Sequence, residues 1–92
     1  MLICTVISNV WATKKEESLN GLKLMVVRED QEDSDKTIKY PFVAADMVGA
    51  GIGEQVLVVS GSTARYAVRN KDAPVDAAIV GIIDTLEVEK TK

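Results

Sequence analysis

Four carboxylates could in principle act in acid–base chemistry or bind a metal: Asp46, Glu54, Asp76 and Asp84. A general acid–base pair or a calcium site needs carboxylates at a defined spacing, and no two of these residues show one. The chain contains no histidine, which excludes imidazole-dependent nucleophiles and histidine-ligated metals. We interpret the four carboxylates as turn, cap or salt-bridge residues, with Arg65 as a candidate partner for one of them.

Cys4 is the only cysteine, and it lies within an apolar run. A single cysteine allows neither an internal disulfide nor a cysteine-based zinc site. In the middle of a predicted strand, the thiol is expected to be a small buried hydrophobic group rather than a redox centre. The sequence therefore predicts no catalytic residue, no metal and no cofactor.

A glycine motif, Gly49-x-Gly51-x-Gly53, resembles part of a phosphate-binding loop. A dinucleotide fingerprint requires a strand before the glycines and a helix after them, but here a predicted strand follows. The third glycine also comes one position early, and Glu54 adds a negative charge. We expect these glycines to allow positive φ or a close backbone approach, near a subunit contact or an axis.

The segments that must position these residues read mostly as short strands rich in β-branched residues. Strands are predicted over residues 2–11, 22–27, 38–47 and 55–60, with a fifth that starts at Ala77 and ends near Glu87. Asn20-Gly21 is a turn signal, and residues 28–39 form a polar, acidic loop. Ser62 or Thr63 is expected to cap a single helical turn.

Five short strands, glycine-rich turns and no long amphipathic helix predict an all-β fold. The expected architecture is a five-stranded, OB-like antiparallel barrel with at most a short helical turn. The 92 residues form one domain, 1–92, with a disordered tail from about residue 89. Several strands are apolar on both faces, so part of the apolar surface is expected to lie between subunits.

Charge and composition argue against two other classes of protein. The chain has 11 basic and 14 acidic residues, a net charge of -3 and only 4% aromatic residues. Nucleic-acid-binding OB-folds use a positive groove and aromatic platforms, so no nucleic-acid partner is expected. No apolar run is long enough to cross a membrane. Lys14 and Lys15 follow the apolar N-terminal run, which is the wrong order for a secretory signal, and a cytoplasmic location is expected.

Four stretches together resemble the EutN/CcmL family, the pentameric vertex proteins of bacterial microcompartments. They are residues 10–15 with 18–24, residues 43–54 (VAADMVGAGIGE), residues 56–65 (VLVVSGSTAR) and residues 74–84 (PVDAAIVGIID). The resemblance covers nearly the whole chain. One departure is Thr63, which replaces a commoner serine and keeps the hydroxyl.

The resemblance implies a barrel assembled as a homopentamer at the fivefold corners of a shell built mainly from hexameric shell proteins. It implies no catalytic activity and a location in the shell of a microcompartment. The expected subunit-interface or pore residues are Gly49, Ala50, Gly51, Ile52, Gly53, Glu54, Ser60, Gly61, Ser62, Thr63 and Arg65. The expected contacts to neighbouring shell tiles are Trp11, Thr13, Lys14 and Lys15.

Arg65 directly follows a predicted turn, where a planar guanidinium suits a fixed site. We expect it to be partly buried and paired with a carboxylate or with backbone carbonyls near the ring contact. Judged on residue types alone, two alternatives stay open: an OB-fold module that binds nucleic acid or another ligand, and a small enzyme or metal-binding subunit.

Overall fold

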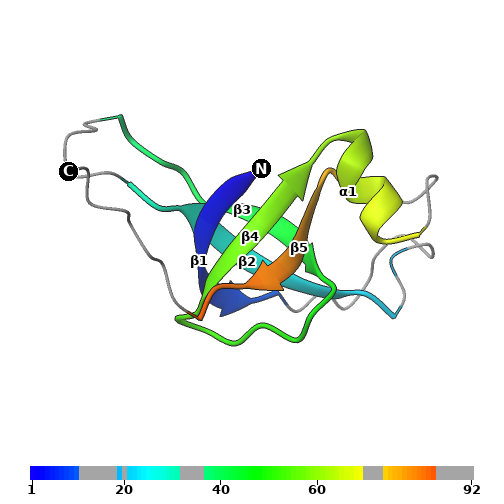
Figure 1. Cartoon of the computed structure of the whole chain (residues 1–92), viewed down its shortest axis with the longest axis horizontal. Helices are drawn as coiled ribbons and strands as arrows, with labels where there is room; N and C mark the ends of the chain where they lie inside the picture. Colours follow the sequence, from blue (N-terminus) through cyan, green and yellow to red (C-terminus); the bar gives the residue numbers. More distant parts are fainter. Residues whose placement is uncertain (11–18, 20, 32–36, 70–73, 85–92) are drawn as a thin grey trace, which may run out of the picture.

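The structure is a computed structural model that describes residues 1–10, 19, 21–31, 37–69 and 74–84 (Figure 1). Its elements are β1 (Leu2–Asn9), β2 (Lys23–Glu29), β3 (Phe42–Asp46), β4 (Gln55–Ser60), α1 (Ser62–Ala67) and β5 (Ala77–Ile82). The predicted tail, from about residue 89, lies outside the described residues.

The strands form a closed barrel in the order β1-β2-β3-β5-β4. Four of the neighbouring pairs are antiparallel, as expected. β3 and β5 pair in parallel instead, through only two registered positions, Ala45 opposite Ala78 and Asp46 opposite Ile79. The expected five-stranded OB-like barrel with one short helix is therefore confirmed, and its antiparallel character holds everywhere except at this seam.

Strand boundaries follow local chemistry. β4 covers the residues predicted for it, while β2 runs further, to Glu29. β3 begins only at Phe42, after Pro41, which has no N–H to donate to a neighbouring strand. β5 ends at Ile82, earlier than expected. In β1 the register with β2 shifts between Val6 and Ser8, so Ile7 is the extra residue of a bulge.

The core has two parts. The barrel interior holds the buried side chains of Cys4, Val6, Met25, Val27, Ala44, Ala50, Val56, Val58, Ala77 and Ile79. A second cluster lies between the outside of the barrel and α1 and contains Ala45, Val59, Ala64, Val68, Val75 and Ala78. Because both faces of β4 and β5 are buried, the two-sided apolar pattern of these strands is satisfied partly within one chain.

The helix begins differently from the expectation. Gly61, with φ 66°, is the N-cap residue, and no side-chain hydrogen bond caps the helix. Its carbonyl accepts the amides of Ala64 and Arg65. The prediction that Ser62 or Thr63 caps the helix is wrong, because both lie inside the first turn. A glycine with positive φ allows the chain to leave β4 and turn directly into the helix.

Several large apolar side chains remain exposed on a single chain. Among them are Tyr40, 75% exposed, and Tyr66, 86% exposed, the latter on α1. Ile38, which precedes β3, and Val43, on the outer face of β3, are also exposed. This surface is available for contacts between subunits, which is where the sequence predicts part of the apolar surface to lie.

Candidate functional site

The loop from Met47 to Glu54 joins β3 to β4 and contains six of the predicted interface residues, Gly49 to Glu54. Its conformation is set at the first end by Asp46, the last residue of β3. One carboxylate oxygen of Asp46 accepts the amides of Val48 and Gly49, each at 3.0 Å. The other accepts the amide of Ala50 at 2.8 Å. Three consecutive amides therefore converge on one buried carboxylate, as in an Asx turn.

Lys23, on β2, balances the charge of this carboxylate. Its ammonium lies 3.6 Å from Asp46 Oδ2, and it also donates to the carbonyl of Ala50 at 3.3 Å. The side chain of Asp46 has no exposed surface, whereas that of Lys23 is about half exposed. The interpretation of Asp46 as a turn and salt-bridge residue is confirmed, but its cationic partner is Lys23 and not Arg65.

The second end of the loop is bonded to β1. The amide of Gly53 donates to the carbonyl of Val6 at 2.9 Å, and the amide of Val6 donates to the carbonyl of Glu54 at 3.0 Å. Within the loop, the Glu54 carboxylate accepts the amide of Gly51 at 2.6 Å. The loop is therefore fixed at both ends by the barrel and braced across its middle.

The three glycines have different reasons to be glycine. Gly49 and Gly53 have φ of 80° and 89°, the left-handed region expected for them. Gly51 is not in that region, so of the two expected reasons for glycine only the close approach applies to it. A Cβ there would lie 3.3 Å from Glu54 Oε1, the tip of a flexible side chain. The close approach at Gly51 is thus within the loop itself.

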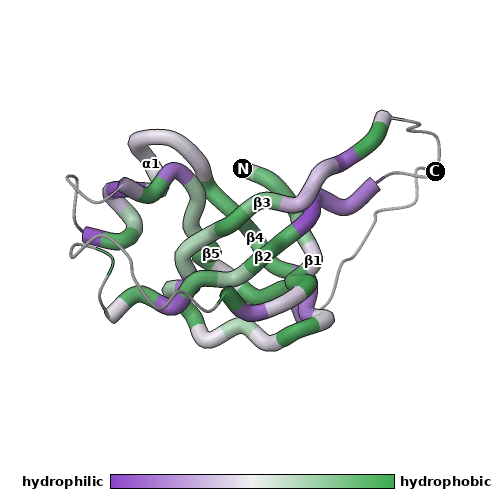
Figure 2. Tube along the Cα trace, turned by 180° about the vertical axis from the view of Figure 1, so that it is seen from behind, coloured by the Kyte–Doolittle hydropathy of each residue, from purple (hydrophilic) through white to green (hydrophobic). Residues whose placement is uncertain are grey.

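The loop carries both buried and exposed apolar side chains. Ala50 is buried in the barrel core and anchors the loop, so it has almost no surface to offer a partner. Met47, Val48 and Ile52 are exposed, Ile52 by 62%. Figure 2 shows the corresponding hydrophobic stretches along the loop at the lower edge of the view. The loop therefore holds apolar groups toward solvent in a fixed arrangement.

The other predicted interface residues begin at Ser60, the last residue of β4, and continue with Gly61, Ser62, Thr63 and Arg65. Ser60, Ser62 and Thr63 are exposed, and Gly61 lies exposed between them. Arg65 is half-buried, as expected, but it forms no ion pair or hydrogen bond with a side chain among the described residues; its pairing stays a prediction. Glu54 and Gly61 flank β4 at its two ends, so one subunit does not bring the two segments together.

The remaining candidates do not form a reactive cluster. Asp76 and Asp84 are exposed. Within the described residues, no three histidine, cysteine, aspartate or glutamate side chains are grouped so that they could hold a metal. In the same part of the chain, no helix is long and apolar enough to cross a membrane. The predicted tile contacts, Trp11, Thr13, Lys14 and Lys15, lie outside the described residues.

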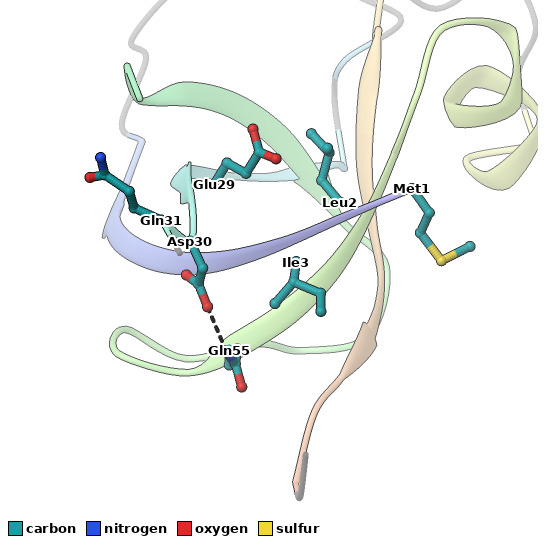
Figure 3. A pocket seen from close by; sticks show the side chains of 7 residues that line it. All are labelled: Met1, Leu2, Ile3, Glu29, Asp30, Gln31 and Gln55. Carbon is teal, nitrogen blue, oxygen red and sulfur yellow. Dashed lines mark hydrogen bonds between the residues drawn. The ribbon is translucent and has the colours of Figure 1, made fainter. Parts of the chain in front are cut away.

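A separate cavity of about 370 Å³ opens beside the first residues of β1 (Figure 3). At its floor, Asp30 accepts hydrogen bonds from the Thr5 hydroxyl, at 2.6 Å, and from the Gln55 amide. These bonds tie the end of β2 to β1 and β4. Both oxygens of Asp30 are thereby engaged in hydrogen bonds, and the other carboxylate that lines the cavity, Glu29, forms an ion pair with Lys39 at 3.6 Å.

Cys4 is fully buried in the barrel, as expected for a small hydrophobic group. Burial, followed by the nearby carboxylates of Glu29 and Asp30, raises the pKa of its thiol from 9.0 to about 11. Only the thiolate is a nucleophile. A thiol pKa that is higher by two lowers the thiolate fraction near neutral pH about 100-fold. The surrounding core side chains also block access of a reagent to the sulfur.

We therefore expect iodoacetamide at pH 8 to alkylate Cys4 at least about 100-fold more slowly in the native protein than in urea. Intact-mass measurement of the alkylated fraction over time gives both rates, and the urea-unfolded chain is the matched control. Alkylation of the native protein at the unfolded rate would show that the thiol is neither buried nor suppressed.

Comparison with known proteins shows similarity over nearly the whole chain. The family model described as "Ethanolamine utilisation protein EutN/carboxysome" matches residues 1–84. The carboxysome shell vertex protein CcmL of Synechococcus elongatus is 47% identical over 89 residues, which cover 97% of this chain and 89% of that protein.

Solved structures agree. The structure of Gloeobacter violaceus CcmL superimposes with a TM-score of 0.82 at 38% identity, covering 97% of this chain and 91% of that one. The GrpN pentameric microcompartment shell protein from Rhodospirillum rubrum superimposes with a TM-score of 0.78 at 43% identity, covering 97% of this chain and 100% of that one.

A five-stranded barrel with a braced apolar loop, matched end to end by shell vertex proteins, defines a structural protein of bacterial microcompartment shells. The chain belongs to the EutN/CcmL family. The resemblance noted in the sequence is thereby confirmed, as are the structural vertex role and the location in a microcompartment shell, whereas the nucleic-acid-binding alternative finds no support.

Proposed function

We propose that five copies of this chain form a closed ring that occupies the fivefold vertices of a shell built mainly from hexameric shell proteins. The observation that supports the ring most directly is the match, over 97% of this chain, to a shell protein described as pentameric. The role is mechanical: the ring supplies a shape, and no step of catalysis is assigned to it.

A closed ring requires a heterologous interface, in which one patch of a subunit meets a different patch of its neighbour. The chain offers two separate patches. One is the Met47–Glu54 loop with its exposed apolar side chains, and the other is the segment Ser60 to Arg65. Because these two segments flank β4 in one chain, contact between them across a subunit boundary fits the geometry of a ring.

The outer contacts of the ring are part of the same proposal. Thr13, Lys14 and Lys15, with Trp11 beside them, are assigned to contact with neighbouring hexameric tiles. The support is the charge of this segment and its membership in a family motif.

We expect native mass spectrometry of the purified protein at micromolar concentration to show five chains of 10.0 kDa, a species of about 50 kDa. Burial of the exposed apolar side chains between copies is the physical reason. Sedimentation at the same concentration checks the mass in solution. A stable monomer or dimer in both measurements would exclude the ring.

A further inference from the structure

The bonds around Asp46 exceed what is needed to end a strand. Its carboxylate accepts three consecutive amides, from Val48 to Ala50, and its side chain has no exposed surface. The ammonium of Lys23 balances the charge of this carboxylate and donates a hydrogen bond to the carbonyl of Ala50. Hydrogen bonds to a buried carboxylate are among the stronger ones, and removing one partner leaves a buried donor unsatisfied. The first half of the loop therefore depends on a single side chain.

The groups displayed by this fixed loop are apolar. Met47 and Val48 are 39% and 41% exposed, and Ile52 is 62% exposed. A chain that stayed alone in solution would gain nothing from holding three exposed apolar side chains in one arrangement. A chain that binds another copy gains affinity from the fixed loop, because a preformed loop loses little conformational entropy on association.

We infer that Asp46 is the positioning residue for association between copies of this chain: it fixes the Met47–Glu54 loop so that Met47, Val48 and Ile52 pack against a second copy. The inference rests on the proposed ring. The second copy is the occupant because relatives of this length and fold form pentamers and because the loop is already braced by its own barrel.

Asp46→Asn tests the inference sharply. The amide can replace one oxygen as an acceptor for Val48 and Gly49, but its NH₂ group then faces the amide of Ala50, donor against donor. We expect hydrogen exchange of a peptide over residues 47–54 to become at least tenfold faster, with β4 and β5 unchanged. We expect the ring to dissociate at a roughly tenfold higher chain concentration.

Three further variants separate the contributions. Asp84→Asn makes the same charge change at an exposed site and should alter neither quantity. Lys23→Met keeps all three amide bonds of Asp46 and should shift both quantities in the same direction but less. Ile52→Ser leaves the bracing intact and removes one apolar contact, so it should weaken the ring without changing loop exchange in the monomer.

The outcomes distinguish this inference from the proposed ring contact. If Asp46→Asn loosens the loop while the ring dissociates at the wild-type concentration, the positioning role is overturned. In that case the Ile52→Ser variant tells whether the loop is the subunit contact at all. If its ring is weaker than the wild type, the loop still contacts the second copy; if its ring is equally stable, the loop is not the contact. If Asp46→Asn speeds exchange throughout the barrel, Lys23→Met decides: faster loop exchange with a weaker ring supports the inference, and faster loop exchange with a wild-type dissociation profile overturns it.

Discussion

Replacing Ile79 by alanine is expected to lower the free energy of unfolding by about 3 kcal/mol. Ile79 has no exposed surface and lies in the barrel interior, at the centre of β5. Its neighbours on β3 and β4 are held in register, so they cannot collapse into the space that the substitution leaves. Stability of a chain this small is of the order of 5–14 kcal/mol, so the loss is a large fraction of it.

Urea unfolding followed by circular dichroism measures this effect, at one fixed chain concentration because association adds to apparent stability. Ile79→Val is the matched control and should cost about 1 kcal/mol. Arg28→Ala, at an exposed position of β2, should stay within about 0.5 kcal/mol. Equal midpoints for Ile79→Ala and Arg28→Ala would contradict the assignment of Ile79 to the core.

Deleting the gene from its host is expected to leave shells that are elongated, unclosed or leaky, while the encapsulated enzymes keep their activity in lysate. The reason is geometric. Flat hexameric tiles extend a sheet indefinitely, and a polyhedron closes only where fivefold units introduce curvature. In the proposed assembly a small ring supplies that curvature by its shape, so its loss is expected to affect closure of the shell and not the chemistry inside it.

Electron microscopy of purified shells and retention of cargo on washing measure closure. A plasmid copy of the unaltered gene should restore closed shells, and a copy that carries Ile79→Ala should restore fewer, since its barrel is less stable. Normally closed, impermeable shells in a deletion strain that has no second vertex paralogue would overturn the vertex role in this host.

Much of the fold could be predicted from local patterns. The bounds of β4 and the number of strands follow from β-branched runs separated by glycine turns. Positive φ at Gly49 and Gly53 is permitted because glycine has no Cβ, although Gly51 shows that glycine does not require it. The burial of Cys4 follows from its apolar surroundings. Each of these properties depends on neighbours within a few positions of the chain.

Features that join distant parts of the chain could not be predicted. Lys23 and Asp46 are 23 positions apart, and nothing in either segment selects Lys23 over Arg65 as the partner. The parallel pairing of β3 with β5 depends on where the barrel closes. The convergence of three amides on Asp46 had a partial signal, an aspartate at the end of a strand before a glycine-rich loop. That signal predicts a turn but not its exposed apolar side chains.

The order of strands around the barrel has a consequence for synthesis of the chain. β1 pairs with β4, where Leu2 lies opposite Val58, and β5 fills the place between β3 and β4. A nascent chain can form the β1–β2 pair early, but it cannot close its barrel before Ala77 to Ile82 have left the ribosome. A subunit therefore has no closed core until β5 has emerged, and recruitment of a folded subunit into a growing shell must follow the synthesis of Ile82.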